Sequence, residues 1–163
     1  MKAGRISLLA AIVLCGAAPL AQAVTCGAST AGLAFGAYNL LSPSPLTANA
    51  TVRITCSLQP SDGPAQRVVA FPITLSQGWS NSFATRQMGS GANRLNYNVF
   101  TTNTYTTVWG DGSGGTQVLG VSFTLNPAFP TRFRDLTGYG RVPALQDVAA
   151  GSYQDALLVT LTF

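Results

Sequence analysis

The chain contains no histidine among its 163 residues, and its acidic residues are five aspartates with no glutamate. Without histidine, Ser-His-Asp and Cys-His nucleophile systems are excluded. The five aspartates are separated in sequence, which disfavours a paired-carboxylate glycosidase site, although Asp135 and Asp147 could meet in space. The sequence therefore predicts a protein that is not an enzyme and that uses no cofactor.

The one long apolar run stands at the start of the chain. Lys2 and Arg5 precede the apolar residues 6–20, and Ala21-Gln22-Ala23 forms a small-x-small cleavage site. The run is shorter than a comfortable bilayer span. We therefore predict a bacterial Sec signal peptide over residues 1–23 and a single mature domain over residues 24–163.

Charge is also scarce, at 9% of the residues. Seven arginines and five aspartates follow the predicted signal peptide, which leaves a net charge of +2 for the mature chain. A charge this weak and scattered is not the footprint of a nucleic-acid or membrane-surface protein.

Of the three cysteines, Cys26 and Cys56 remain after the predicted cleavage. In an exported chain, an even pair predicts one disulfide. The chain-entropy model gives such a bond about 3 to 4 kcal/mol of stabilisation. A metal site is the alternative for these thiols, but no histidine or neighbouring cysteine would complete it.

Alternating apolar residues predict short strands, and no window outside the signal has helical periodicity. Pro72 suggests an edge strand or a bulge, residues 77–94 suggest a long loop or an irregular hairpin, and residues 132–141 show no clear pattern. Six or seven strands separated by Gly, Pro, Ser and Asn turns indicate one antiparallel sandwich. The expected strands lie at 33–38, 51–58, 69–75, 95–99, 119–125 and 153–163.

The last of these segments alternates up to the final residue. Tyr153, Leu157, Val159, Leu161 and Phe163 fall on one face, as expected for a half-buried strand. Two interpretations remain open from the residues alone. The segment is either the last strand of an ordinary sandwich or a strand beside a gap that another polypeptide fills.

An ordered set of segments in this chain is distinctive. It consists of Leu33–Tyr38, Ile54-Thr-Cys56, Leu95–Phe100 with Val108–Gly112, and Tyr139–Pro143. Its most specific member is Gly151-Ser-Tyr-Gln-Asp155 with the alternating strand that follows. Together these segments resemble the spore coat U domain family, which includes the secreted pilins of Csu-type, archaic chaperone–usher pili. The resemblance covers essentially the whole predicted mature chain.

This resemblance implies an immunoglobulin-like antiparallel sandwich that is incomplete because its last strand is missing. A periplasmic pilus chaperone would lend a strand, and a neighbouring pilin subunit would replace it after passage through an outer-membrane usher. The resemblance assigns the partner-strand groove to Tyr153, Leu157, Val159, Leu161 and Phe163. It also implies a location in the periplasm and at the cell surface.

The predicted mature start differs from that of a fibre-forming pilin. A donor strand of usual length needs more residues than the two, Val24 and Thr25, that would precede Cys26. We therefore expect an accepting subunit at the tip or end of a fibre, or a family member outside pili. A two-domain tip adhesin is not expected, because residues 24–163 make one domain.

Two other functions remain open. The first is a free-standing secreted module that binds a surface or a carbohydrate, with loop aromatics such as Trp79, Tyr105 or Trp109 as its binding face. The second is a protective coat protein, which the family name suggests.

Overall fold

Strands with one apolar face, joined by turns, build the part of the chain that the structure describes. The structure is a computed structural model that describes residues 24–163, and the predicted signal peptide lies outside these residues. No helix within them is long and apolar enough to cross a membrane. The elements are β1 (Thr25–Thr30), β2 (Leu46–Ser57), the 3-10 turn η1 (Pro60–Asp62), β3 (Arg67–Leu75), the 3-10 turn η2 (Gly78–Ser80), β4 (Arg86–Ser90), β5 (Asn93–Phe100), β6 (Leu119–Leu125), β7 (Thr131–Val142) and β8 (Val159–Leu161).

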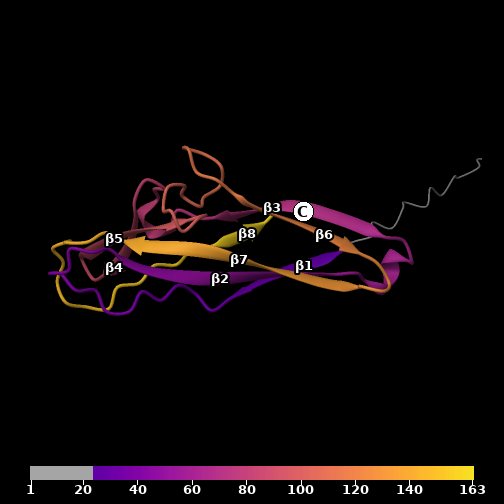
Figure 1. Ribbon diagram of the computed structural model, residues 1–163, viewed down its shortest axis with the longest axis horizontal. Helices are drawn as coiled ribbons and strands as arrows, with labels where there is room; N and C mark the ends of the chain where they lie inside the picture. Colours follow the sequence, from indigo (N-terminus) through magenta and orange to yellow (C-terminus); the bar gives the residue numbers. More distant parts are fainter. Residues whose placement is uncertain (1–23) are drawn as a thin grey trace, which may run out of the picture.

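These strands form two antiparallel sheets (Figure 1), with the order β1-β2-β7-β5-β4 in one and β6-β3-β8 in the other. The 12-residue strands β2 and β7 pair from Leu46↔Val142 to Ser57↔Thr131 and run along the length of the molecule. The arrangement confirms the predicted all-β antiparallel sandwich, with more strands than the six or seven expected.

The core lies between the two sheets, and the predicted alternation supplies it. Val52, Ile54 and Cys56 of β2 are buried, the last two completely. Each fully buried side chain of this size contributes about 1.5–3 kcal/mol relative to an exposed one. The other predicted strands contribute Phe71, Ile73, Leu75, Leu95, Tyr97, Val99, Val121, Phe123 and Leu125.

The sequence pattern misses β7, the central strand of the larger sheet. Its first five residues, Thr-Arg-Phe-Arg-Asp, are all exposed and include only one apolar side chain, so no alternation marks them. Further along, glycine replaces the inward side chains: a Cβ on Gly140 would lie 2.6 Å from Leu33 Cδ2 and 2.8 Å from the Phe35 ring. Pairing with β2, rather than local propensity, therefore makes this segment a strand.

Two predicted strands are absent or shortened. Residues 33–38 form no strand, and the expected strand at 153–163 is reduced to β8. The alternation of half-buried and exposed residues persists in the C-terminal segment, from Tyr153 to Leu161. A strand also needs a ladder of hydrogen bonds, and these segments lack a neighbouring strand on one side or both.

The predictions for Pro72 and for residues 77–94 are correct in part. β3 lies at the centre of its sheet rather than at an edge, but β8 pairs with it only from Ile73 to Leu75. Pro72 therefore stands where only β6 is paired, and its missing N–H is tolerated as it is on an edge strand. Residues 77–94 contain η2 and then the start of the β4–β5 hairpin.

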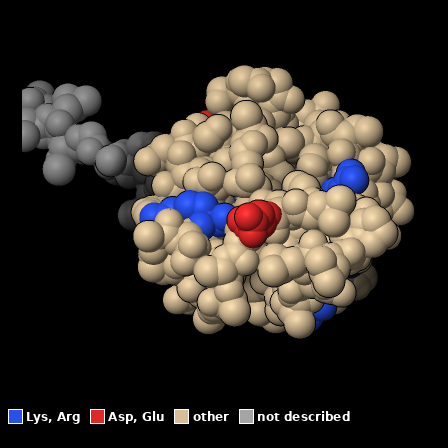
Figure 2. Space-filling model, turned by 90° about the vertical axis from the view of Figure 1, so that its left-hand side faces the viewer, with Lys and Arg blue, Asp and Glu red and all other residues tan. Residues whose placement is uncertain are grey.

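Charged side chains are sparse on the folded surface. Figure 2 shows one end of the molecule, where a few basic and acidic groups interrupt an otherwise uncharged surface. Arg53 of β2 and Asp135 of β7 form an ion pair across neighbouring strands, with Nε and Oδ1 2.7 Å apart.

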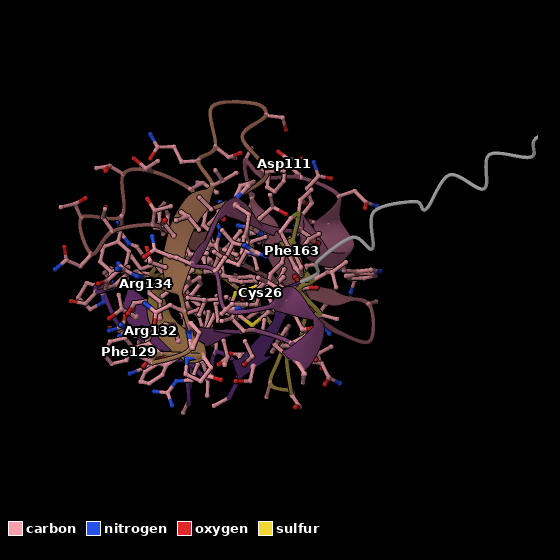
Figure 3. The ribbon with its side chains drawn as sticks, turned by 90° about the vertical axis from the view of Figure 1, so that its right-hand side faces the viewer. Cys26, Asp111, Phe129, Arg132, Arg134 and Phe163 are labelled. Carbon is pink, nitrogen blue, oxygen red and sulfur yellow. A yellow bond between two sulfur atoms is a disulfide. The ribbon has the colours of Figure 1, made fainter. Side chains whose placement is uncertain are left out.

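The sandwich has two long sides where strands of the two sheets meet without pairing. On the β1/β8 side, each strand is the end strand of its sheet. On the β6/β7 side, the end strand β6 faces the first part of β7, to which residues 126–130 connect it. In Figure 3, Phe129, Arg132 and Arg134 gather at the left, apart from Cys26 and Phe163.

We predict that Gly140→Ala lowers the free energy of unfolding by about 1–3 kcal/mol, because the added methyl group displaces Leu33 and Phe35 from a packed site. Urea unfolding of the mature protein measures the change. Gly120→Ala on β6 is the matched control, since a Cβ there meets no atom within 4 Å. Equal losses in the two variants would contradict this account of β7.

Candidate functional site

A hollow runs along the β1/β8 side of the sandwich. Two cavities of about 420 and 720 Å³ lie there, and both are lined by Leu33, Phe35, Met88 and Tyr153. Because they share these side chains, the cavities are parts of one hollow, which we call the groove. Its walls are the segment 32–38 that follows β1 and the segment 148–159 that leads into β8.

The floor of the groove is the sandwich core. Val52, Leu75, Val99 and Trp109 line it and are buried. The wall side chains are only half-buried and lean over this floor; the Phe35 ring, for example, meets the ring of Tyr97 edge to face, with centroids 5.9 Å apart. The groove is therefore apolar at its base and open at its top.

The backbone of both walls lacks strand partners within the described part of the chain. Residues 31–38 make no backbone hydrogen bond with another strand. In the opposite wall, Gln154 exchanges two hydrogen bonds with Gly89, of 2.8 and 3.1 Å, and the Leu158 carbonyl accepts one of 3.0 Å from Ser76. These bonds tie that wall on one side only. An edge with free N–H and C=O groups is a template for another strand.

The structure places the five predicted groove residues unequally. Tyr153, Leu157 and Val159 line the groove. Leu161 packs against the core and lies opposite Ile73 of β3. Phe163 is 65% exposed, and its ring centroid lies 5.0 Å from that of Phe71. The last two residues thus lie beyond the end of the cavity.

Sequence reasoning missed Asp155, which alternates onto the same inward face. Its Oδ2 accepts a hydrogen bond of 2.7 Å from the Tyr97 hydroxyl, and its Oδ1 accepts one of 3.0 Å from the Trp79 backbone N–H. Burial, followed by this bond to Asp155, raises the pKa of Tyr97, which therefore stays protonated as a donor. The aspartate of the Gly-x-Tyr-x-Asp segment was visible in the sequence, but its side-chain partners were not.

A buried arginine supports the same wall from behind. Arg86 is completely buried, and burial lowers its pKa. Its Nε and Nη2 donate to the Ser76 carbonyl at 3.0 and 2.8 Å, Nη1 donates to Asn98 Oδ1 at 2.6 Å, and Nη2 also donates to the Trp109 carbonyl at 2.8 Å. Because Ser76 in turn donates to Leu158, Arg86 helps to position the segment that borders the groove.

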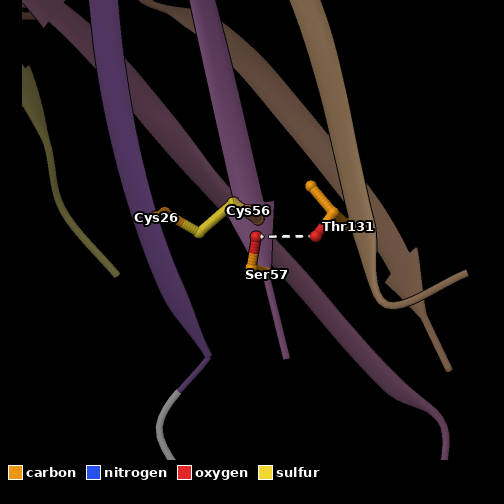
Figure 4. Close-up of a disulfide and its surroundings, with 4 residues drawn as sticks. All are labelled: Cys26, Cys56, Ser57 and Thr131. Carbon is orange, nitrogen blue, oxygen red and sulfur yellow. Dashed lines mark hydrogen bonds between the residues drawn. A yellow bond between two sulfur atoms is a disulfide. The ribbon is translucent and has the colours of Figure 1, made fainter. Parts of the chain in front are cut away.

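The opposite wall begins at the predicted disulfide, which the structure contains (Figure 4). Cys26 of β1 and Cys56 of β2 face each other across the two strands and are joined by a bond that closes a 30-residue separation. On the other side of β2, the Ser57 hydroxyl hydrogen-bonds to the Thr131 hydroxyl at 2.9 Å. β1 is thereby fixed to the larger sheet while its outer edge stays open.

Two aspartates outside the groove are held in local contacts. Asp135 is held by Arg53, whose hydrogen bond lowers the pKa of that carboxyl group. Asp111 closes its own turn by accepting hydrogen bonds from the backbone and hydroxyl of Ser113, which lower its pKa. Within residues 24–163 no group of three or more His, Cys, Asp or Glu side chains is suited to hold a metal ion.

The prediction that loop aromatics form an exposed binding face is wrong for Trp109. Trp109 is 1% exposed, and its indole N–H donates to the Ile73 carbonyl at 3.0 Å. Trp79 is 53% exposed and lies under the Arg94 guanidinium, 3.5 Å from the ring centroid. Tyr105 is half-buried against Phe100. The three aromatic residues therefore do not make a shared exposed face.

Comparison with known proteins supports the resemblance seen in the sequence. The family model of the Spore Coat Protein U domain matches residues 13–160. No curated protein matches the chain. One similar solved chain comes from the crystal structure of the CsuC-CsuE chaperone-tip adhesion subunit pre-assembly complex from archaic chaperone-usher Csu pili of Acinetobacter baumannii.

That match has a TM-score of 0.54 and 19% sequence identity, and it covers 86% of this chain and 40% of the other. At this identity it establishes the fold alone. The present chain thus spans less than half the length of the chain that it resembles.

We predict that Asp155→Ala destabilises the protein by about 1–3 kcal/mol, because the Tyr97 hydroxyl, whose residue is 4% exposed, loses its acceptor in a buried setting. Denaturant unfolding of the mature protein measures the loss. Asp147→Ala, which removes an exposed carboxylate from the same C-terminal region, is expected to change stability by less than about 0.5 kcal/mol. A neutral Asp155→Ala would show that this contact does not hold the wall.

Proposed function

Because the chain belongs to the Spore Coat Protein U domain family, we propose that it is a non-enzymatic structural subunit of a chaperone–usher pilus that accepts a β-strand from another polypeptide. The groove on the β1/β8 side is the acceptor. The donor is a periplasmic chaperone before assembly and a neighbouring subunit in the fibre, and an outer-membrane usher mediates the exchange.

The open groove is the observation that carries this proposal. It combines an apolar floor, two walls of alternating half-buried side chains and two end strands that have no outer partner among residues 24–163. An inserted strand would satisfy the free N–H and C=O groups of the walls, while its alternate side chains would fill the 420 and 720 Å³ cavities. A complete sandwich would have its own last strand in this place.

The solved relative supports the identity of the partner. Its crystal structure holds a chaperone with a tip adhesion subunit before assembly. By analogy, we expect the present chain to cross the inner membrane through the Sec system and to meet such a chaperone in the periplasm. Tyr153, Leu157, Val159, Leu161 and Phe163 would then border the donated strand, the first three within the groove and the last two beyond its end.

The proposed place in the fibre depends on the processing site. Cleavage after Ala23 would leave two residues, Val24 and Thr25, ahead of Cys26. Thr25 is already paired with Ser57 of β2, and the disulfide joins Cys26 to Cys56. Such a subunit would accept a strand without donating one and would stand at an end of the fibre.

We predict that the protein isolated from periplasm has the intact mass of residues 24–163 with one disulfide. Mass spectrometry with and without a reducing agent measures both features. A mature chain that starts well upstream of Val24 would supply a donor segment and would contradict the terminal position, while leaving the accepting groove in place.

The groove itself is tested by two adjacent leucines. Leu157 lines the groove, whereas Leu158 is 67% exposed on the opposite face. We predict that Leu157→Arg abolishes co-purification with a co-expressed archaic-type pilus chaperone, because a donated strand would bury the new charge without a partner. Leu158→Arg is the matched control and is expected to keep one-to-one capture.

Affinity co-purification from periplasm, read by the ratio of the two bands, measures the outcome. Circular dichroism of each variant checks that its strands have formed. Equal capture of the two variants would contradict the groove as the binding site, and a wild-type protein that ignores the chaperone and unfolds cooperatively as a monomer would contradict the pilin role itself.

A further inference from the structure

The β6/β7 side of the sandwich, like the groove, has strand edges without hydrogen-bond partners in the described part of the chain. β7 pairs with β2 along its whole length, but β5 pairs with it only at Tyr139–Arg141. The edge of β7 from Thr131 to Thr137 therefore has no strand partner within the described chain. The end strand β6 pairs on one side only, with β3. This side thus also presents free edges to an incoming strand.

Two arginines occupy the core-facing positions of that free edge. Arg132 and Arg134 lie opposite Cys56 and Ile54 of β2, both of which are fully buried. Side chains alternate along a strand, so the two arginines point to the same face of the sheet as these core residues and as the half-buried Leu136. They are nevertheless exposed, because they stand at the rim of the sandwich.

One contact at the rim involves Arg132, and the nearest acidic side chain on the same strand is paired with another arginine. The Arg132 guanidinium lies 4.2 Å from the centroid of the Phe129 ring, in the turn that connects β6 to β7. On the outer face of the same strand, Asp135 is bound by Arg53 through two hydrogen bonds of 2.7 Å. Figure 3 shows Phe129, Arg132 and Arg134 together on this side.

The two sides of the sandwich therefore differ in the side chains at their open edges, which are apolar on one side and charged on the other. Leu33, Phe35, Leu157 and Val159 line the groove on the β1/β8 side, whereas Arg132 and Arg134 stand at the corresponding rim of the β6/β7 side. A strand that added to β7 would cover both guanidinium groups between the sheets. Burying an unpaired charge is costly, and inward-pointing charges on an edge strand are a known means of preventing strand addition.

We propose that Arg132 and Arg134 block strand addition on the β6/β7 side and so restrict donated strands to the groove. The inference rests on the proposed function, since it assumes that this chain meets strands that seek an open edge. It assigns the two arginines a role in specificity: they decide which of two open sides takes part in assembly.

The test replaces both charges in the mature protein. Arg132→Val/Arg134→Val keeps good strand formers at these positions and removes the charge. We expect this variant to self-associate, with a shift from the wild-type elution volume to dimers or larger species in size-exclusion chromatography with light scattering. Amide hydrogen exchange of the assembled species is expected to show new protection at Thr131–Thr137.

A charge-reversed variant separates two explanations. Arg132→Glu/Arg134→Glu still places unpaired charges at the rim, so we expect it to elute like the wild type. If association depended instead on losing the positive charge, rather than on losing any unpaired charge at the rim, the reversed variant would associate as the neutral variants do. Arg132→Thr/Arg134→Thr provides a second neutral variant, with the same expected association, if the valine pair does not fold.

Each result decides the matter. Neutral variants that keep the wild-type elution volume overturn the proposal, as does a charge-reversed variant that assembles equally well. Failure of the proposed function is recognised separately, in the complex with a co-expressed archaic-type pilus chaperone. The wild type and the neutral variants are expected to gain protection at Gly151–Leu158 there, and its absence would leave the result at Thr131–Thr137 in the isolated protein unaffected.

Discussion

An unpaired edge of a β-sheet is the constraint on which the rest of this structure depends. Backbone N–H and C=O groups need partners, and in the part of the chain that the structure describes both walls of the groove lack them on one side. The chain manages this edge differently at its two sides. On the β1/β8 side the edge is apolar and remains available, whereas on the β6/β7 side two arginines stand at the rim.

Three sets of contacts hold the groove open in a defined shape. The Cys26–Cys56 disulfide fixes β1 to β2, so one wall starts from a rigid point. Asp155 connects the other wall to Tyr97, and the buried Arg86 secures Ser76, to which Leu158 is bonded. The first of these is covalent, and the other two are short hydrogen bonds inside the protein. They place the wall segments at the groove without supplying the strand that would complete it.

The sequence predicted the sandwich because its buried strands alternate: the spacing of Val52, Ile54 and Cys56 alone assigns them to one face, and all three are buried in the core. It could not predict β7, since core-facing positions occupied by Arg132, Arg134, Gly138 and Gly140 carry no apolar pattern, and the strand owes its form to pairing with β2. For the groove, alternation assigned the inward face of Tyr153, Leu157 and Val159 correctly. It could not reveal that the backbone there is unpaired, nor that Asp155 would reach Tyr97, because both depend on segments distant in sequence.

The most direct test of the accepting groove is amide hydrogen exchange of the mature protein, measured alone and after co-purification with a co-expressed archaic-type pilus chaperone. The account predicts fast exchange at Gly151–Leu158 in the free protein and strong protection there in the complex, with β2 protected in both. Equal, slow exchange at Gly151–Leu158 in the two samples would mean that the sandwich is already complete, and it would contradict the account.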